Sequence, residues 1–217
     1  MPKLTKGILI AIEGIDGSGK TTLAQNLSTI LKENEFDVLL TKEPGATDLG
    51  KKIREIVQTQ NVPLCGIAEY LLFAADRAQH FAELILPQLA ANTLIISDRM
   101  SDSSLAYQGY GNKLDFTMIQ TINQWTMKNI TPDLTIFVKV PVSIALERAK
   151  KRGSLSAYEK REKFLSEVAA GFEELYKNRA EVIILDGTQD QQTLMHQCYK
   201  MIDIWIKKHV IITPSNS

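Results

Sequence analysis

The sequence is poor in several features that would point to particular classes of protein. Its 217 residues include only two cysteines, Cys65 and Cys198, which lie far apart and lack metal-like spacing. We therefore expect two buried, reduced thiols rather than a disulfide framework or a zinc site. No apolar run is long enough for a transmembrane helix, and Glu13 ends the run Ile8–Ile12 without a signal cleavage site. The cytoplasm is the expected location.

The chain also lacks an excess of charge of either sign. Lys and Arg together number 25, as do Asp and Glu, so no general field attracts nucleic acid or an anionic membrane. Neither is an expected partner, and any anion binding must be local. The apolar share of 44% is ordinary for a globular protein. We find no linker or repeat, so residues 1–217 are expected to form one domain.

What the sequence does contain is a regular alternation of short apolar runs and helical patterns. Nearly continuous apolar runs are typical of parallel strands covered on both faces. The expected strands are Ile8–Ile12, Val38–Thr41, Thr93–Ser97, Leu134–Val138 and Val182–Leu185. The expected helices are Thr21–Lys32, Leu49–Gln58, Ile67–Leu89, Asp115–Asn129, Val142–Lys151, Glu159–Asn178 and Thr193–Lys207. The alternation predicts a three-layer α/β fold, a five-stranded parallel sheet with helices on both faces. The tail "HVIITPSNS" is interpreted as a frayed end.

One motif in this pattern is specific for nucleotide phosphates. The stretch "GIDGSGKT" fits G-x-x-x-x-G-K-[ST], follows a predicted strand and opens a predicted helix. Its glycines let backbone N–H groups surround an anion, Lys20 adds a mobile charge and Thr21 adds a hydroxyl for Mg²⁺. The expected ATP-binding residues are Gly14, Ile15, Asp16, Gly17, Ser18, Gly19, Lys20, Thr21 and Thr22. We conclude that the chain is a P-loop protein that binds a nucleoside triphosphate.

P-loops serve switch GTPases, motors and small-molecule kinases alike. The stretch Asn112–Asp115 matches the guanine-reading motif N-K-x-D, but it follows "AYQGYG", read as a polar, Gly-rich loop, instead of ending a strand. We interpret the match as chance. A small-molecule kinase needs a second anion pocket, for which Arg54, Arg77 and Arg99 are candidates. Asp98 and Arg99 end a predicted strand, where α/β proteins bind ligands and where an aspartate can hold Mg²⁺.

Four stretches together resemble the thymidylate kinase family. They are "EGIDGSGKTT", "EPGATDLGKKIR", "LLFAADRAQH" and "DRMSDSSLAYQG", in the order and spacing of that family from about Ile8 to Asp186. The resemblance implies the P-loop NTPase fold and transfer of phosphate from ATP to dTMP with Mg²⁺.

The resemblance also implies roles for residues of the acceptor site. Phe73 would stack on thymine, Arg77 would donate to its O4, and Ser104 would face its N3 edge. Tyr107 would occupy the space of a ribose 2′-OH, and Gln108 would line the pocket.

A second set of roles concerns the phosphates. Arg54 and Arg99 would hold the acceptor phosphate, and Asp16 would bind the sugar 3′-OH or join the Mg²⁺ shell. Asp98 would orient metal-bound water. Catalysis would need alignment and charge neutralisation, without a covalent intermediate.

The sequence departs from the family pattern at three places. Lys42 and Ala46 replace an arginine and a glycine of "TREPGGT", and Met100 replaces an aromatic residue. Lys42 keeps the positive charge of the arginine but lacks its forked guanidinium, and Ala46 requires a backbone without positive φ.

The third departure is in the lid, expected at about residues 148–160. The family pattern R-G-x-x-D-R-x-E reads "RGSLSAYE" here, so the usual catalytic arginine is missing. We expect Arg152 to take its role, with Arg148 as substitute and Lys160 and Arg161 as weaker candidates.

Two other functions stay open on sequence grounds. One is a different nucleoside monophosphate or deoxynucleoside kinase, and the other is a non-catalytic nucleotide-binding switch. The family resemblance further implies a homodimer, for which the apolar stretch Ile67–Leu89 gives weak support.

Overall fold

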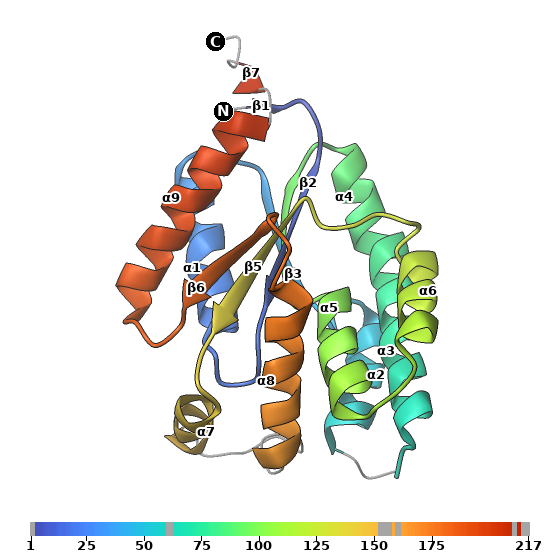
Figure 1. Ribbon diagram of the computed structural model, residues 1–217. Coiled ribbons are helices and arrows are strands. Elements are labelled where there is room, and N and C mark those ends of the chain that lie inside the picture. Colours follow the sequence, from blue (N-terminus) through green and yellow to red (C-terminus); the bar gives the residue numbers. More distant parts are fainter. Residues whose placement is uncertain (1–2, 60–62, 152–157, 159–161, 210–211, 214–217) are drawn as a thin grey trace.

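The computed structural model describes residues 3–59, 63–151, 158, 162–209 and 212–213. A parallel sheet in the order β3-β4-β2-β5-β6 forms its centre (Figure 1). The strands are β2 (Ile8–Glu13), β3 (Val38–Lys42), β4 (Leu94–Asp98), β5 (Leu134–Lys139) and β6 (Val182–Asp186). The predicted five-stranded parallel sheet is therefore confirmed, with strand ends shifted by one residue.

Helices cover both faces of this sheet, as predicted. One face packs against α1 (Lys20–Glu33) and α9 (Gln191–His209) through a core that includes Leu27 and Ile202. The helices α3, α4, α5, α6 and α8 lie on the opposite side (Figure 1). The remaining helical bounds are α2 (Asp48–Thr59), α3 (Gly66–His80), η1 (Phe81–Ile85), α4 (Leu86–Ala90), α5 (Ser101–Ser104), η2 (Leu105–Gly111), α6 (Phe116–Thr126), α7 (Val142–Lys151) and α8 (Glu162–Tyr176).

The expected helix 67–89 is continuous but changes its hydrogen-bonding pattern in the middle. The segment η1 is a π-helix, and the amide of Leu86 donates to Phe81 in the i→i−5 pattern. Pro87 follows directly and has no N–H for the carbonyl of Glu83, so a regular α-helix could not continue through this turn.

Three expectations from the sequence are wrong. The stretch "AYQGYG" is not a loop but part of the π-helix η2, and Leu105–Gly109 are buried. The C-terminal tail is not simply frayed, because β7 (Ile212–Thr213) pairs antiparallel with β1 (Lys3–Leu4). Of the two cysteines, Cys198 is buried as expected but Cys65 is exposed; both are free thiols.

The sheet brings residues from distant parts of the chain to one edge. The carboxyl ends of β2, β4 and β3 lie side by side, with Asp98 in register with Ile12 on one side and Lys42 on the other. In doubly wound sheets this edge is where ligands bind. Within the described part of the chain, no helix is long and apolar enough to cross a bilayer.

Candidate functional site

The P-loop connects β2 to α1 in the conformation that its glycines permit. Gly17 has a φ of 81°, and a Cβ there would lie 2.4 Å from the carbonyl oxygen of Ala145. Position 17 therefore excludes the basic residue that some P-loops carry, for steric as well as conformational reasons. Lys20 begins α1 and donates to the carbonyl of Ile15 at 3.1 Å, with Nζ 3.8 Å from Asp16.

Burial places Lys20 under electrostatic strain. Desolvation, helped by the nearby charge of Arg99, lowers its pKa to about 8, although Asp16 and Asp98 act in the opposite sense. A phosphate beside Lys20 would favour the charged ammonium, and its negative charge would offset both the desolvation and the repulsion from Arg99. The ammonium is thus prepared to receive phosphate.

Two cavities meet at this lysine. The first, of about 600 Å³, lies over the carboxyl ends of β3 and β4. The second, of about 790 Å³, extends from the P-loop to Arg148 and the loop 187–191. Both are lined by Asp16, Lys20 and Thr21. Each volume is in the range of small-molecule sites, so two ligands can meet end to end at the P-loop.

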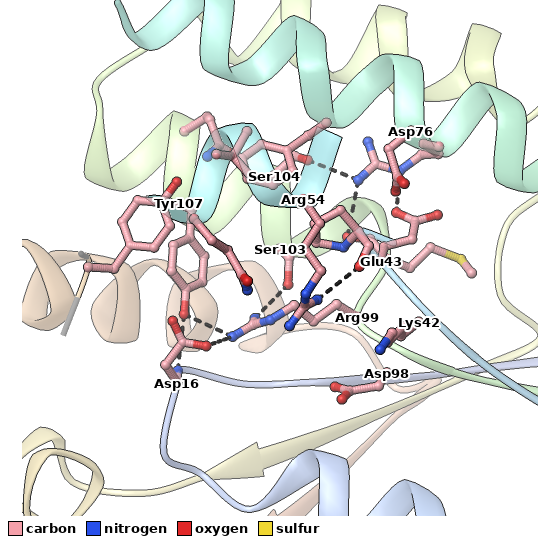
Figure 2. Close-up of a pocket in the computed structure, with 18 of the residues that line it drawn as sticks. Asp16, Lys42, Glu43, Arg54, Asp76, Asp98, Arg99, Ser103, Ser104 and Tyr107 are labelled. Carbon is pink, nitrogen blue, oxygen red and sulfur yellow. Dashed lines mark hydrogen bonds and ion pairs between the residues drawn. The ribbon is translucent and has the colours of Figure 1, made fainter. Parts of the chain in front are cut away.

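Arg99 ties the P-loop to the wall of the first cavity (Figure 2). It has a φ of 73°, and its Nη1 donates to the carbonyl of Gly14 at 2.8 Å. Its Nη2 donates to Asp16 at 2.5 Å and to the Tyr107 hydroxyl at 3.1 Å. A non-glycine residue with positive φ is uncommon and tends to occur at functional sites, where its surroundings hold it in place.

Glu13 holds the start of the helix that follows Arg99. Its carboxylate accepts from the amide of Met100 at 2.8 Å and from the hydroxyl of Ser103 at 2.5 Å. Burial, reinforced by the charge of Asp102, raises the pKa of Glu13 to about 7, against the lowering effect of Ser103 and Arg99. A strand residue thereby supplies the acceptor that a helix N-terminus needs.

Arg77 is almost completely buried at the far wall of the first cavity. Its guanidinium donates to Glu43 at 2.8 Å, to Asn123 at 2.7 Å and to Ser104 at 3.0 Å. Burial alone would raise the pKa of Glu43, but Arg77 and His80 outweigh it and hold that pKa below its ordinary value. The pair is therefore a buried ion pair with satisfied hydrogen bonds.

The π-helix η2 presents two further side chains to this cavity. The amide nitrogen of Gln108 donates to Glu69 at 3.0 Å, which fixes the orientation of the amide and leaves its oxygen as the acceptor of that side chain. The Tyr107 ring packs edge-on against Tyr158, with ring centroids 5.4 Å apart, and is only 5% exposed. Both side chains are thereby fixed in orientation before any ligand binds.

The metal-binding residues expected from the sequence lie together. The Thr21 hydroxyl donates to Oδ2 of Asp98 at 2.5 Å, and Oδ1 of Asp98 is buried without a hydrogen-bond partner in the described structure. One carboxylate and one hydroxyl beside a phosphate site suit Mg²⁺, which keeps several waters and binds few protein ligands. No cluster of three or more His, Cys, Asp or Glu that could hold a metal occurs among the described residues.

The structure brings together nearly all of the residues that the sequence pointed to. Those lining the first cavity are Asp16, Lys20, Thr21, Arg54, Phe73, Arg77, Asp98, Arg99, Ser104, Tyr107 and Gln108. Residues 16–22 of the P-loop line the second. Gly14 and Ile15 instead offer their carbonyls to Arg99 and Lys20. Arg152, Lys160 and Arg161 lie outside the described residues.

Other lining residues were missed. Glu43, Asp76, Ser103 and Tyr158 line the first cavity without having been predicted. Arg148, the predicted substitute for Arg152, lines the second cavity. Glu43 lies in the stretch "EPGATDLGKKIR" and Asp76 in "LLFAADRAQH", so their place in family-like stretches was the sequence feature that could have indicated a site role. Of the departures, Lys42 lines the first cavity, and Gly45 rather than Ala46 has the positive φ, 108°.

The N-K-x-D match has another role. Asp115 is the N-cap of α6 and accepts from the amide of Met118 at 2.7 Å. Asn112 donates to Glu69 at 3.3 Å. The motif therefore follows a helix rather than a strand, in agreement with its interpretation as a chance match.

A P-loop with two cavities meeting at its lysine, on a parallel sheet covered on both faces, defines a phosphotransferase of the P-loop NTPase fold. The thymidylate kinase family model matches residues 12–198. This chain belongs to the thymidylate kinase family.

Similarity to individual proteins extends over most of the chain. It is 38% identical over 200 residues to the thymidylate kinase of Halothermothrix orenii, covering 91% of this chain and 97% of that one. It is 40% identical over 190 residues to that of Carboxydothermus hydrogenoformans, covering 87% and 93%. The crystal structure of the Ehrlichia chaffeensis thymidylate kinase superposes with a TM-score of 0.75 at 28% identity, covering 91% and 99%.

Proposed function

We propose that this enzyme transfers the γ-phosphoryl group of ATP to dTMP, giving dTDP and ADP, within a single kinase domain. Family membership supports the reaction. The observation that carries it is the meeting of two cavities at Asp16, Lys20 and Thr21. A switch protein needs one nucleotide site, whereas a kinase needs a second, facing the γ-phosphate.

The first cavity would bind dTMP with its base at the Arg77 end. Phe73 is half-buried on the cavity wall and offers a flat apolar surface for the base. Arg77 would donate to O4, Ser104 would lie at the N3 edge, and the side-chain carbonyl of Gln108 would accept from a base N–H. Cytosine presents an amine where thymine presents O4, so Arg77 would face a donor.

The acceptor phosphate would lie between Arg54, Arg99 and Lys42. All three line the first cavity on the side of the P-loop (Figure 2). Guanidinium groups bind phosphate through paired hydrogen bonds, and Lys42 adds a point charge. Arg99 would turn partly or wholly from Asp16 towards the phosphate, and the Asp16 carboxylate would accept from the sugar 3′-OH.

The second cavity would hold ATP. Its phosphates would contact the P-loop amides and Lys20, and its adenosine would lie towards Arg148 and the loop 187–191. Arg148 already donates to the carbonyl of Ser18 at 3.3 Å. Arg152, in the lid at about 148–160, keeps its proposed role of neutralising the transferred group.

The reaction is a direct displacement. An oxygen of the dTMP phosphate forms a bond to the γ-phosphorus while the bond from that phosphorus to the β-γ bridging oxygen breaks, and ADP takes the electron pair. Lys20 and the arginines hold the reactants in line and offset the negative charge. Thr21 and Asp98 would hold Mg²⁺, which supplies additional neutralisation of the phosphates when bound.

We also propose a homodimer located in the cytoplasm. Large apolar side chains are exposed on α2, α3 and α6, namely Leu49, Ile56, Ile67, Leu71 and Trp125. Helix α2 packs against α3, and α3 packs against α6, so these residues lie on neighbouring elements. The free thiols Cys65 and Cys198 suit a reducing compartment.

A coupled assay of ADP release across a panel of nucleoside monophosphates tests the function. With ATP and Mg²⁺, dTMP should give the highest kcat/KM, followed by dUMP, with dCMP, dGMP and UMP far lower. Preference for another monophosphate would favour a different kinase. Tight nucleotide binding with slow hydrolysis and no dependence on an acceptor would favour a switch protein.

A further inference from the structure

Behind Arg77 lies a chain of buried polar side chains that the proposed reaction does not use. Nδ1 of His80 lies 3.1 Å from Oε1 of Glu43, and Nε2 of His80 lies 2.7 Å from the hydroxyl of Thr41. Glu43 in turn accepts from Nε of Arg77. His80 is 0% exposed, so its ring has no access to solvent.

The direction of these hydrogen bonds follows from the chemistry of the groups. An ionised carboxylate only accepts, so Nδ1 of His80 must carry the proton that faces Glu43. In a neutral ring Nε2 is then an acceptor, and the Thr41 hydroxyl donates to it. Each oxygen of Glu43 therefore has one donor, Arg77 on one side and His80 on the other.

The same contacts leave Arg77 with one N–H group for a ligand. Of the five that a guanidinium carries, Nε uses one with Glu43 and Nη1 uses one with Asn123. Nη2 uses two, with Ser104 and with the carbonyl of Met100 at 3.4 Å. Among the described residues, only the second N–H of Nη1 has no acceptor.

If Arg77 makes only one hydrogen bond to the base, the direction of that bond depends on the rotation of the planar guanidinium. Glu43 fixes the Nε edge of the guanidinium, and His80 fixes Glu43. His80 and Thr41 do not line the first cavity, so they can influence a ligand there only through Glu43 and Arg77.

We propose that Glu43 and His80 are positioning residues that set the discrimination of this enzyme between thymine and cytosine, by holding towards base position 4 the N–H of Arg77 that no described residue accepts. The proposal rests on the proposed role of Arg77 as the base-reading residue. It assigns a function to the glutamate of "EPGATD" and the histidine of "LLFAADRAQH", neither of which has a role in phosphate transfer.

The test compares dTMP with 5-methyl-dCMP, which keeps the methyl group and changes the chemistry at position 4 and N3. The readout is the ratio of their kcat/KM values. Loss of a hydrogen bond from a charged donor is worth roughly tenfold to hundredfold. Arg77→Ala and Glu43→Gln should reduce the ratio by that amount. His80→Phe should reduce it by roughly threefold to tenfold, because His80 acts on Arg77 only through Glu43.

Four further variants separate positioning from a general loss of structure. His80→Asn can return an N–H to Glu43 and should restore most of the ratio. Thr41→Val should lower it slightly, whereas Thr41→Ser should not change it. Gln79→Ala, next to His80 on α3 but outside the chain of contacts, is the matched control. In all of them KM for ATP and kcat at saturating dTMP should change less than twofold.

The outcomes distinguish the two levels of the proposal. If Arg77→Ala leaves the ratio unchanged, the proposed base-reading role of Arg77 is wrong. If Arg77→Ala lowers the ratio but Glu43→Gln, His80→Phe and Thr41→Val do not, the positioning role is wrong and that of Arg77 stands. A parallel rise in KM for both dTMP and ATP would show a merely structural effect and would also overturn the proposal.

Discussion

Lys20 is a buried ammonium beside a guanidinium, and its lowered pKa of about 8 gives a direct prediction at the scale of one residue. The anionic phosphates of ATP favour the charged form, so binding should raise this pKa and take up a proton. At pH 8 we expect an uptake of roughly half a proton per ATP, since a group at its pKa is half protonated. Calorimetry in two buffers of different ionisation enthalpy measures it.

Lys20→Arg is the matched control, because an arginine stays charged throughout this range and should abolish the uptake. Lys20→Ala should also abolish phosphoryl transfer without unfolding the protein. An unchanged uptake in Lys20→Arg would assign the proton to another group, such as Glu13.

Tyr107 allows its ring and its hydroxyl to be tested separately. The hydroxyl accepts from the amide of Asp16 and from Arg99, both at 3.1 Å, while the ring packs among aromatic side chains. Tyr107→Ala should admit a 2′-OH and raise the activity ratio of UMP to dUMP roughly tenfold or more, whereas Tyr107→Phe should leave that ratio unchanged. The ratio is an internal measure, which matters because truncating a buried aromatic residue costs about 3–5 kcal/mol of stability. Equal ratios in both variants would remove the ring from sugar discrimination.

At the scale of elements, Glu13 connects β2 to the start of α5, and its pKa gives a prediction for stability. Burial raises this pKa from 4.5 to about 7, so the folded state holds the proton more tightly than the unfolded state. The resulting stabilisation is present below pH 4.5 and is lost as the pH rises through 7. Between pH 5 and pH 8 it should reduce the free energy of unfolding by about 2–3 kcal/mol.

Urea unfolding of the ligand-free protein at the two pH values checks this prediction. In Glu13→Gln the free energy of unfolding should fall less between pH 5 and pH 8 than in the wild type, by the amount given above. Glu33→Gln, at an exposed position on α1, should show the same fall as the wild type. An identical decrease in all three proteins would contradict the raised pKa of Glu13.

The arginines around α7 give a second prediction at this scale. The P-loop offers no cation besides Lys20, and Gly17 is confined by Ala145. Arg152→Ala should therefore lower kcat by roughly hundredfold to thousandfold and change KM for dTMP much less, because the contact forms mainly in the closed complex. If Arg148→Ala has that effect instead, the role belongs to the end of α7. Lys150→Ala, exposed on the same helix, is the control.

The helices and strands also differ in how well the sequence predicts them. Strands and the P-loop were predictable because their signals are local: apolar runs of four or five residues, and glycines at fixed spacing. The helix η2 was not, because Gly109 and Gly111 suggested a loop. Position 111 instead requires glycine for packing, since a Cβ there would lie 2.4 Å from the ring of Phe164 in α8.

The contacts within the acceptor site could not be predicted from the sequence either. The family resemblance pointed to Arg77 and Arg99, but the partners of Arg77 are 34 and 46 residues away in sequence, at Glu43 and Asn123. No periodicity or spacing links such positions. Only the tertiary packing, with α3 against α6 and the residue after β3 within reach of Arg77, brings these side chains together.

At the scale of the whole molecule, the exposed apolar residues of α2, α3 and α6 are the feature that a monomer does not explain well. Isolated exposed apolar side chains are normal, but five of them on three adjoining helices favour an interface. In a two-fold dimer every substitution occurs twice across the same interface. A single charged residue should therefore have a large effect.

Leu71→Glu in α3 should convert the proposed dimer into a monomer. Desolvating or opposing two new carboxylates costs several kcal/mol, and every 1.4 kcal/mol weakens association tenfold, so we expect at least a roughly hundredfold weaker dimer. Leu71 is 48% exposed in the single chain, and Ile204 on α9, at 55%, is a matched position outside these three helices. Ile204→Glu should leave the assembly unchanged. Sedimentation velocity over a range of protein concentrations distinguishes the variants. A monomeric wild-type protein, or a dimer that Ile204→Glu disrupts and Leu71→Glu does not, would place the interface elsewhere or remove it.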